Sequence, residues 1–164
     1  MDHAVSAAAD RRTRGSVSVE VAVLAPAFIT LVVLAGVAGR VAVADEAVEA
    51  AAHDAARAAS ISRDAPTAKR AAEDAARRQL DWRGLNCAGA PQVSVWGSTG
   101  GDGRVSLTTA YGRPLLGEPV SIWVRVSCAV SLDDIRFPGL SGWSGTKRVE
   151  ATFASPLDSY RSRG

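Results

Sequence analysis

An uncharged apolar stretch near the N-terminus constrains this 164-residue chain more than any other feature. No charged side chain occurs from Val21 to Gly39, where Val, Leu, Ala, Ile and Phe dominate. A helix of this length crosses the roughly 30 Å hydrocarbon layer of a bilayer. Basic residues precede the stretch and acidic residues follow it: Arg11, Arg12 and Arg14, then Asp45, Glu46 and Glu49. Because basic flanks stay in the cytoplasm, the sequence predicts one span with the N-terminus inside and the remainder outside.

Three features in or beside this stretch depart from a plain membrane anchor. Glu20 puts a carboxylate at the edge of the apolar helix, which costs free energy unless the group is paired, protonated or favoured by the helix dipole. Pro26 removes one backbone hydrogen bond and crowds the carbonyl of Ala22, so a kink is predicted there. Ala35 and Gly39 form a small-xxx-small pair that lets a second helix approach closely, although such pairs also arise by chance in alanine-rich helices.

The residues around Glu20 form a pattern of their own. Gly15 follows the arginine-rich leader, Glu20 lies five residues after that glycine, and Pro26 follows inside the apolar helix. A glycine and a glutamate at this spacing resemble the processing site of type IV pilin-like proteins. The whole string from Arg14 to Pro26 resembles the TadE/TadG-like pilus-assembly family, which includes minor pseudopilins of Tad/Flp pili. The sequence departs from the pilin pattern at Ser16, where pilins favour a large apolar residue.

This resemblance implies a processing step and a set of partners. A prepilin peptidase would cut between Gly15 and Ser16, and Glu20 would pair with the new N-terminal amine of a neighbouring subunit during assembly. The implied partners are the prepilin peptidase, other pilin-like subunits and an inner-membrane assembly platform. The implied location is the cell membrane, with a cytoplasmic N-terminus and an extracellular C-terminal domain.

Cleavage as a secretory signal peptide is the open alternative. Ala42-Val43-Ala44 is a small-x-small site of the kind that signal peptidase accepts, so the chain could be cut after Ala44. Against this, the apolar region is longer than the usual roughly 7 to 15 residues of a signal peptide. Arg40 also lies between that region and the cut.

Beyond the apolar stretch, helical patterning continues without Gly or Pro as far as Ser60. Small apolar residues recur three and four positions apart on one face: Ala44, Ala47, Val48, Ala51, Ala55 and Ala58. The sequence predicts one helix from about Val17 to Ser60, preceded by a disordered leader. Alanine contacts bury little area each, so this face needs the following domain or neighbouring subunits to cover it.

A second helix and a sheet are predicted after Ser60. Asp64 can cap a helix whose first turn tolerates Pro66, and this helix is predicted to run to Leu80. After Gly84 the composition shifts to Val, Ser, Thr, Gly and Trp, and alternation replaces helical spacing. The predicted strands are Gln92 to Trp96, Arg104 to Tyr111, Val120 to Leu132 and Lys147 to Ala154.

Two cysteines, Cys87 and Cys128, lie in the part predicted to be exported. An oxidising exterior favours a disulfide between them over two buried free thiols. Alternation places Cys128 on the buried face of its strand, within reach of Cys87 in the loop before the first strand. The bridge would close a loop of about 41 residues and stabilise the domain by about 4 kcal/mol.

The sequence shows no residue pattern typical of catalysis or cofactor binding. The cysteines form no Cys-x-x-Cys pair, and His3 and His53 are the only histidines, which argues against a redox motif or a zinc site. Gly142-Trp143-Ser144-Gly145 lacks the spacing of a nucleophile elbow. A net charge of +2 is too small to indicate nucleic-acid binding. We therefore expect no enzymatic activity, cofactor, metal, nucleic acid or small-molecule substrate.

The expected fold class is α+β: a long N-terminal transmembrane and amphipathic helix, a second short helix, and an antiparallel sheet of about four strands with one disulfide. The expected boundaries are a cytoplasmic leader over 1–14, a transmembrane helix over 15–43, an extracytoplasmic helical region over 44–82 and a β domain over 83–164. The resemblance implies a membrane-anchored minor pilin-like or assembly component of a Tad/Flp-type pilus and secretion system. The alternative function is an anchored or secreted binding module that recognises polysaccharide or another protein through exposed Trp96, Trp123 and Trp143.

Overall fold

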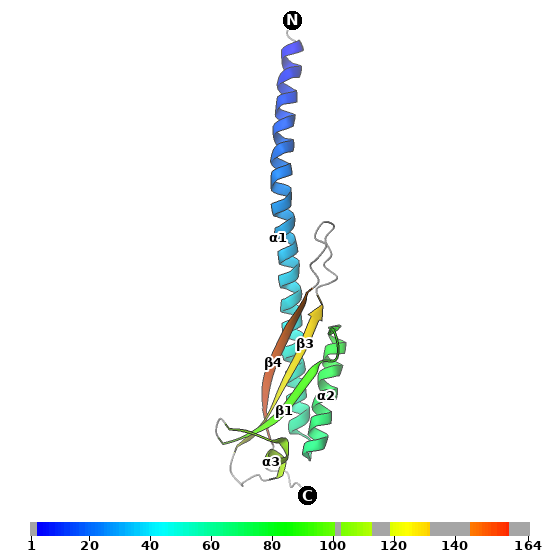
Figure 1. Cartoon of the computed structure of the whole chain (residues 1–164), viewed down its shortest axis with the longest axis vertical. Coiled ribbons are helices and arrows are strands. Elements are labelled where there is room, and N and C mark those ends of the chain that lie inside the picture. The colour runs from blue at the N-terminus through cyan, green and yellow to red at the C-terminus, as the bar shows by residue number, and fades with distance from the viewer. Residues whose placement is uncertain (1–2, 101–102, 113–118, 132–144, 158–164) are drawn as a thin grey trace. The chain divides into compact units, whose positions relative to one another are not determined.

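A computed structural model (Figure 1) describes the backbone of residues 3–100, 103–112, 119–131 and 145–157, and the side chains of these residues from Val19 onward. The chain divides into a first unit, Met1–Gly39, and a second unit, Arg40–Gly164. Helix α1 (His3–Ser60) begins in the first unit and ends in the second. The remaining elements all belong to the second unit: α2 (Ala65–Trp82), β1 (Gln92–Thr99), β2 (Arg104–Val105), α3 (Leu107–Gly112), β3 (Val120–Ser131) and β4 (Thr146–Pro156).

The first helix starts earlier than the sequence predicted. Residues 3–14, expected to be a disordered leader, are helical in α1. Neither glycine nor proline interrupts them, and four of them are alanine, the residue with the highest helix propensity. The leader therefore continues the helix of the span without a break.

A helical hairpin forms one layer of the second unit. The predicted alanine face of α1 is buried between Ala44 and Ala59, and Ala58 is half-buried at its margin. Helix α2 returns beside α1 after a short connection (Figure 1). It buries a matching set: Ala65, Ala68, Ala72, Ala75, Ala76 and Leu80. The alanines of both helices lie in one core cluster, and small side chains of this kind permit close approach.

Asp64 caps α2 as the sequence predicted. Its backbone is extended, and its carboxylate accepts hydrogen bonds from the Thr67 backbone N–H and the Thr67 hydroxyl, each at 2.9 Å. Pro66 lies in the first turn, where its missing N–H costs nothing. The hydrogen bond from the Thr67 backbone N–H, followed by the one from its hydroxyl, holds the pKa of Asp64 below its ordinary value.

This cap makes a testable contribution to the pH dependence of stability. Because the folded-state pKa is depressed, the stabilisation is complete above the unfolded-state pKa and is lost as the pH falls through the folded-state pKa. We expect Asp64→Ala to be less stable than the parent chain at neutral pH, with the difference shrinking in acid. Urea unfolding of the full chain in detergent micelles across pH measures this. Asp64→Asn keeps a capping oxygen but cannot ionise, so a similar acid-dependent loss in that variant would contradict the explanation.

The second layer is an antiparallel sheet in the order β2-β1-β3-β4. Along β3 the side chains alternate between buried and partly or fully exposed, as predicted from the sequence. The inner-face residues of β3 lie in one core cluster with the alanines of α1 and α2: Val120, Ile122, Val124, Val126, Cys128 and Val130. Leu132, the last residue of the predicted strand, lies outside the described residues. The helices therefore cover one face of the sheet, and the other face is the outer one (Figure 1).

The strand predicted from Arg104 to Tyr111 is wrong beyond Val105. Only Arg104 and Val105 pair with β1, and α3 follows. The Ser106 hydroxyl accepts a hydrogen bond from the Thr109 backbone N–H at 3.1 Å, which starts a helical turn instead of continuing the ladder. The turn brings Tyr111 into the core, where its hydroxyl donates to the carbonyl of Ala59 in the last turn of α1. Such a carbonyl has no partner within its own helix.

Gly97 allows α3 to lie close against β1. A Cβ atom at this position would lie 2.4 Å from the Ala110 Cβ and 3.1 Å from Val105 Cγ2. We therefore expect Gly97→Ala to lower the free energy of unfolding by about 1 to 3 kcal/mol through overpacking. Urea unfolding of the full chain in micelles measures the change. Gly103→Ala is the matched control, because an added Cβ there meets nothing within 4 Å. An equal loss in both variants would show that steric contact with α3 is not the cause.

Candidate functional site

The first candidate site is the apolar part of α1. Within the described residues, α1 is the one helix long and apolar enough to cross a membrane, and its apolar window is not buried inside the protein. Large apolar side chains there are open to the surroundings, among them Leu24 at 66%, Phe28 at 69% and Leu31 at 63% exposure. In water such a surface would be unfavourable. This part of α1 is therefore a candidate membrane span, consistent with membrane anchoring.

The predicted site residues of the span lie along this one helix and do not converge on a pocket in the described part of the chain. Glu20 is exposed, and Gly15 and Ser16 are helical. The helix continues through Pro26, whose carbonyl accepts a hydrogen bond from the Thr30 hydroxyl at 2.8 Å. The kink at Pro26 and the roles of Gly15, Ser16 and Glu20 stay predictions.

The predicted helix-packing pair is open to a partner. Ala35 and Gly39 are both exposed, and a Cβ atom added at Gly39 would meet nothing within 4 Å. A second helix could therefore approach this face without displacing any described side chain. Packing by a partner helix at this pair also stays a prediction.

The predicted disulfide is present. Cys87 and Cys128 are bonded, with their Cα atoms 5.4 Å apart and 41 positions apart in sequence. Cys87 also forms a β-bridge with Val130, and the Ala88 backbone N–H donates to the Ala129 carbonyl at 2.6 Å. These contacts tie the loop after α2 to the end of β3. The bond therefore links the helical layer to the sheet.

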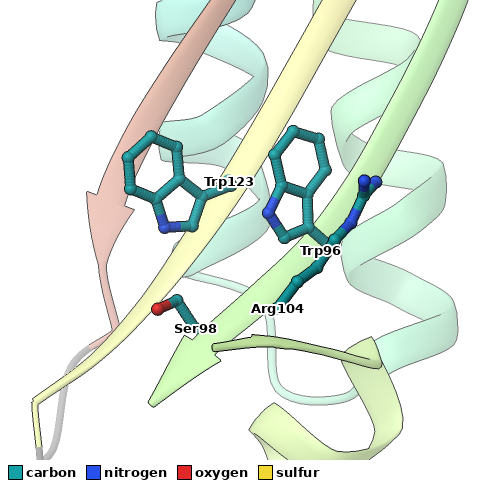
Figure 2. A pocket seen from close by; sticks show the side chains of 4 residues that line it. All are labelled: Trp96, Ser98, Arg104 and Trp123. Carbon is teal, nitrogen blue, oxygen red and sulfur yellow. The ribbon is translucent and has the colours of Figure 1, made fainter. Parts of the chain in front are cut away.

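The second candidate site is a shallow pocket on the outer face of the sheet (Figure 2). Trp96 of β1 and Trp123 of β3 are directly opposite each other in the strand register, and their rings are nearly parallel with centroids 6.4 Å apart. The guanidinium of Arg104 lies 4.0 Å from the centroid of Trp96, and that of Arg125 lies 5.8 Å from it. Ser98 completes the lining. Two partly exposed indole rings and two cations thus form a flat, positively charged patch.

Sequence reasoning found part of this pocket. It singled out Trp96 and Trp123, which the structure brings together, and Trp143, which lies outside the described residues. It missed both arginines. Their place beside Trp96 depends on strand register, since Arg104 pairs with Ser98 and Arg125 with Ser94. The sequence shows Arg104 after a glycine-rich turn and Arg125 in an alternating strand. Neither signal indicates that the arginine contacts Trp96.

The described residues also contain no group of three or more His, Cys, Asp or Glu side chains placed to hold a metal ion. His53 Nδ1 lies 3.3 Å from Asp54 Oδ1 on the exposed side of α1. The His53 ring also packs edge-on against Phe153 of β4. His53 therefore contributes to the packing of α1 against the edge strand β4.

The chain was compared with models of known protein families. The model of TadE-like proteins matches residues 15–57. The match begins at Gly15, includes the apolar part of α1 and extends into the alanine face that the second unit buries. No curated protein and no solved structure matches the chain. Residues 15–57 of this chain are therefore similar to TadE-like proteins, the family that the pattern from Gly15 to Pro26 predicted.

Proposed function

We propose that this chain is a membrane-anchored minor pilin-like or assembly component of a Tad/Flp-type pilus and secretion system. The observation that carries the proposal is the TadE-like match over residues 15–57, which supports a Tad pilus-associated protein in general terms. It falls on the candidate span and begins at the glycine of the predicted processing site. The role is structural, without catalysis, and its partners are a prepilin peptidase, other pilin-like subunits and an inner-membrane assembly platform.

The physical basis of assembly is the exposed first unit. Cleavage after Gly15 would free the amine of Ser16, and the Glu20 carboxylate of one subunit would pair with that amine in its neighbour. In a low-dielectric surrounding an unpaired carboxylate is costly, so this pairing would set the register between subunits. Ala35 and Gly39 would then allow close contact between neighbouring helices.

Membrane retention is favoured over release by a signal peptidase. The TadE-like match continues past the alternative cut after Ala44 to residue 57. Ala44 itself has no exposed surface, because it packs into the core of the second unit. A cut there would remove part of the alanine face that α2 covers. The proposed arrangement keeps the N-terminus in the cytoplasm and the second unit outside the cell, where a disulfide is stable.

The N-terminus of the protein recovered from its native membrane tests the proposal. We expect a mature chain that starts at Ser16, and we expect Gly15→Val to leave the leader attached, as read by N-terminal sequencing and intact mass. Ala42→Leu is the matched control, because it removes the small residue that a signal peptidase needs without touching Gly15. A chain starting at Asp45 whose cleavage stops in Ala42→Leu would overturn membrane retention.

The role of Glu20 needs a separate experiment. We expect Glu20→Gln, which keeps the shape and removes the charge, to abolish incorporation into pili or into the assembly complex while membrane insertion is unchanged. Glu46→Gln is the control, since Glu46 is an exposed carboxylate beyond the span. Normal assembly of Glu20→Gln would reduce Glu20 to a carboxylate at a helix end.

The outer face of the sheet favours a second candidate function, an anchored binding module. Trp96 and Trp123 lie together on that face, with Arg104 and Arg125 beside Trp96. Stacked rings suit the flat faces of sugar rings, and the cations suit acidic sugars. An acidic polysaccharide is therefore the ligand to test first.

Quenching of tryptophan fluorescence in the full chain by polygalacturonate tests this function, with neutral dextran as the comparison polymer. We expect binding to polygalacturonate to be lost in Trp123→Ala and retained in Trp82→Ala. Equal responses to the two polymers, or binding that survives Trp123→Ala, would remove the pocket from consideration.

A further inference from the structure

An exposed tryptophan and several exposed basic side chains lie at one end of the second unit, and the proposed pilus function assigns them no role. Helices α1 and α2 form a hairpin, so the start of α1 within this unit and the end of α2 lie at the same end (Figure 1). Val43 and Trp82 lie equally many residues from the connection between the two helices, counted back from Ser60 on α1 and forward from Ala65 on α2. Trp82 therefore lies at the end of the unit where α1 enters it.

The sheet places basic side chains at the same end. Cys87, which follows Trp82 after a short loop, bridges to Val130 near the end of β3. Across the ladder, Val130 pairs with Lys147 and Ala129 pairs with Arg148. Both basic side chains are exposed. The start of β4 thus adds two cations to the end that carries Trp82.

Trp82 is the most exposed large hydrophobic side chain in the described part of the chain, at 76%. The guanidinium of Arg83 lies 5.4 Å from its ring centroid, and Val43 is 63% exposed. An exposed indole with an adjacent arginine is poorly matched to water alone. It is well matched to the headgroup level of a bilayer, where the ring contacts acyl chains, the indole N–H finds oxygen acceptors and a guanidinium pairs with phosphate.

The charges at this end are mixed. Asp81 on α2 and Asp45 on α1 are exposed beside the basic residues. Each basic residue near an anionic membrane contributes about 1 kcal/mol, and nearby carboxylates offset part of this. The aromatic contact is therefore expected to dominate, with a weaker contribution from anionic lipid.

We infer that Trp82 and Arg83 dock on the phospholipid headgroups of the membrane that anchors the chain. The uncharged apolar stretch of α1 ends at Gly39, immediately before Arg40, which is the first residue of the second unit. The inference rests on the proposed anchoring of this span. It adds that the second unit is held on the bilayer by a second contact, with the end that carries Trp82 facing the lipid and the Trp96 pocket away from it.

Quenching by brominated lipids tests the inference. The full chain with Trp96, Trp123 and Trp143 each replaced by Phe retains Trp82 as its sole tryptophan. It is reconstituted into phosphatidylcholine and phosphatidylglycerol vesicles brominated high on the acyl chain. We expect loss of Trp82 fluorescence, a blue-shifted emission relative to the same protein in micelles, and a smaller loss when the bromines lie near the bilayer centre.

A matched control variant distinguishes docking of Trp82 on the lipid from general proximity of the second unit to the membrane. The variant that retains Trp96 as its sole tryptophan is expected to stay unquenched in the same vesicles. Resistance of each protein to alkaline extraction reports separately whether the span is inserted. An inserted protein with unquenched Trp82 would overturn this inference and leave the anchoring intact, whereas a protein that extracts would overturn both.

Folding of the variants is checked by formation of the Cys87–Cys128 disulfide. If the triple substitution does not fold, fluorotryptophan-labelled parent chain gives one fluorine NMR signal per indole, and Trp82→Phe assigns the signal of Trp82. Broadening of that signal by a spin label at the lipid headgroup would support docking. An unaffected signal would overturn it.

Discussion

Replacing Cys128 by alanine should lower the free energy of unfolding of the second unit by about 4 kcal/mol. The disulfide closes a long loop, and its loss gives the unfolded chain more conformational freedom. Small domains are stable by roughly 5 to 15 kcal/mol, so this change removes a large share of the total. Urea unfolding of the full chain in micelles, followed by far-UV circular dichroism, measures it.

Cys87→Ala and chemical reduction of the parent chain serve as controls for this result. Cys87 is half-buried whereas Cys128 is 2% exposed, so their packing contributions differ while the lost bond is the same. We expect both variants and the reduced parent to lose stability by similar amounts. A reduced parent chain as stable as the oxidised one would show that the bond adds little and that any loss in Cys128→Ala is packing.

Leu80→Ala should cost about 2 to 5 kcal/mol, the range for removing a fully buried leucine. Leu80 is 2% exposed and lies near the end of α2, in a core where most helical positions are alanine. The neighbouring alanines are too short to fill the space. The cavity is therefore expected to remain open and the loss to be large for this substitution.

The volume-conserving variant Leu80→Met separates cavity formation from any effect on the α2 end. It should cost less than about 1.5 kcal/mol in the same urea assay. Equal losses in the two variants would point to the turn after α2, where the Leu85 backbone N–H donates to the Leu80 carbonyl at 3.0 Å, and not to packing.

Much of the helical part was predictable, because its signals are local. An uncharged stretch, an alanine repeat at helical spacing, and an aspartate before a proline each act within a few residues. The leader was the exception, since low hydrophobicity suggested disorder while the structure has it helical from His3. In the sheet, alternation identified β3 and the buried side of Cys128 for the same local reason.

The failures arose where a choice depended on distant residues. The stretch from Leu107 to Gly112 has strand-like composition, but Ser106 turns the chain and the space beside Gly97 accommodates a helix. The contact of Arg104 with Trp96 could not be predicted from the residues next to Arg104 in sequence, because the pairing of β2 with β1 determines it. Two groups 52 positions apart, the Tyr111 hydroxyl and the Ala59 carbonyl, likewise meet only through packing.

The amino-acid pattern was sufficient for the candidate span, the TadE-like motif, the helix cap and the α+β character of the second unit, since each follows from hydrophobicity and hydrogen bonding over short distances. Strand register, the start of α3, the gathering of Trp96, Trp123 and Arg104, and the position of Trp82 required the folded chain. These features depend on which surfaces pack together, and that choice is made by contacts between residues far apart in sequence.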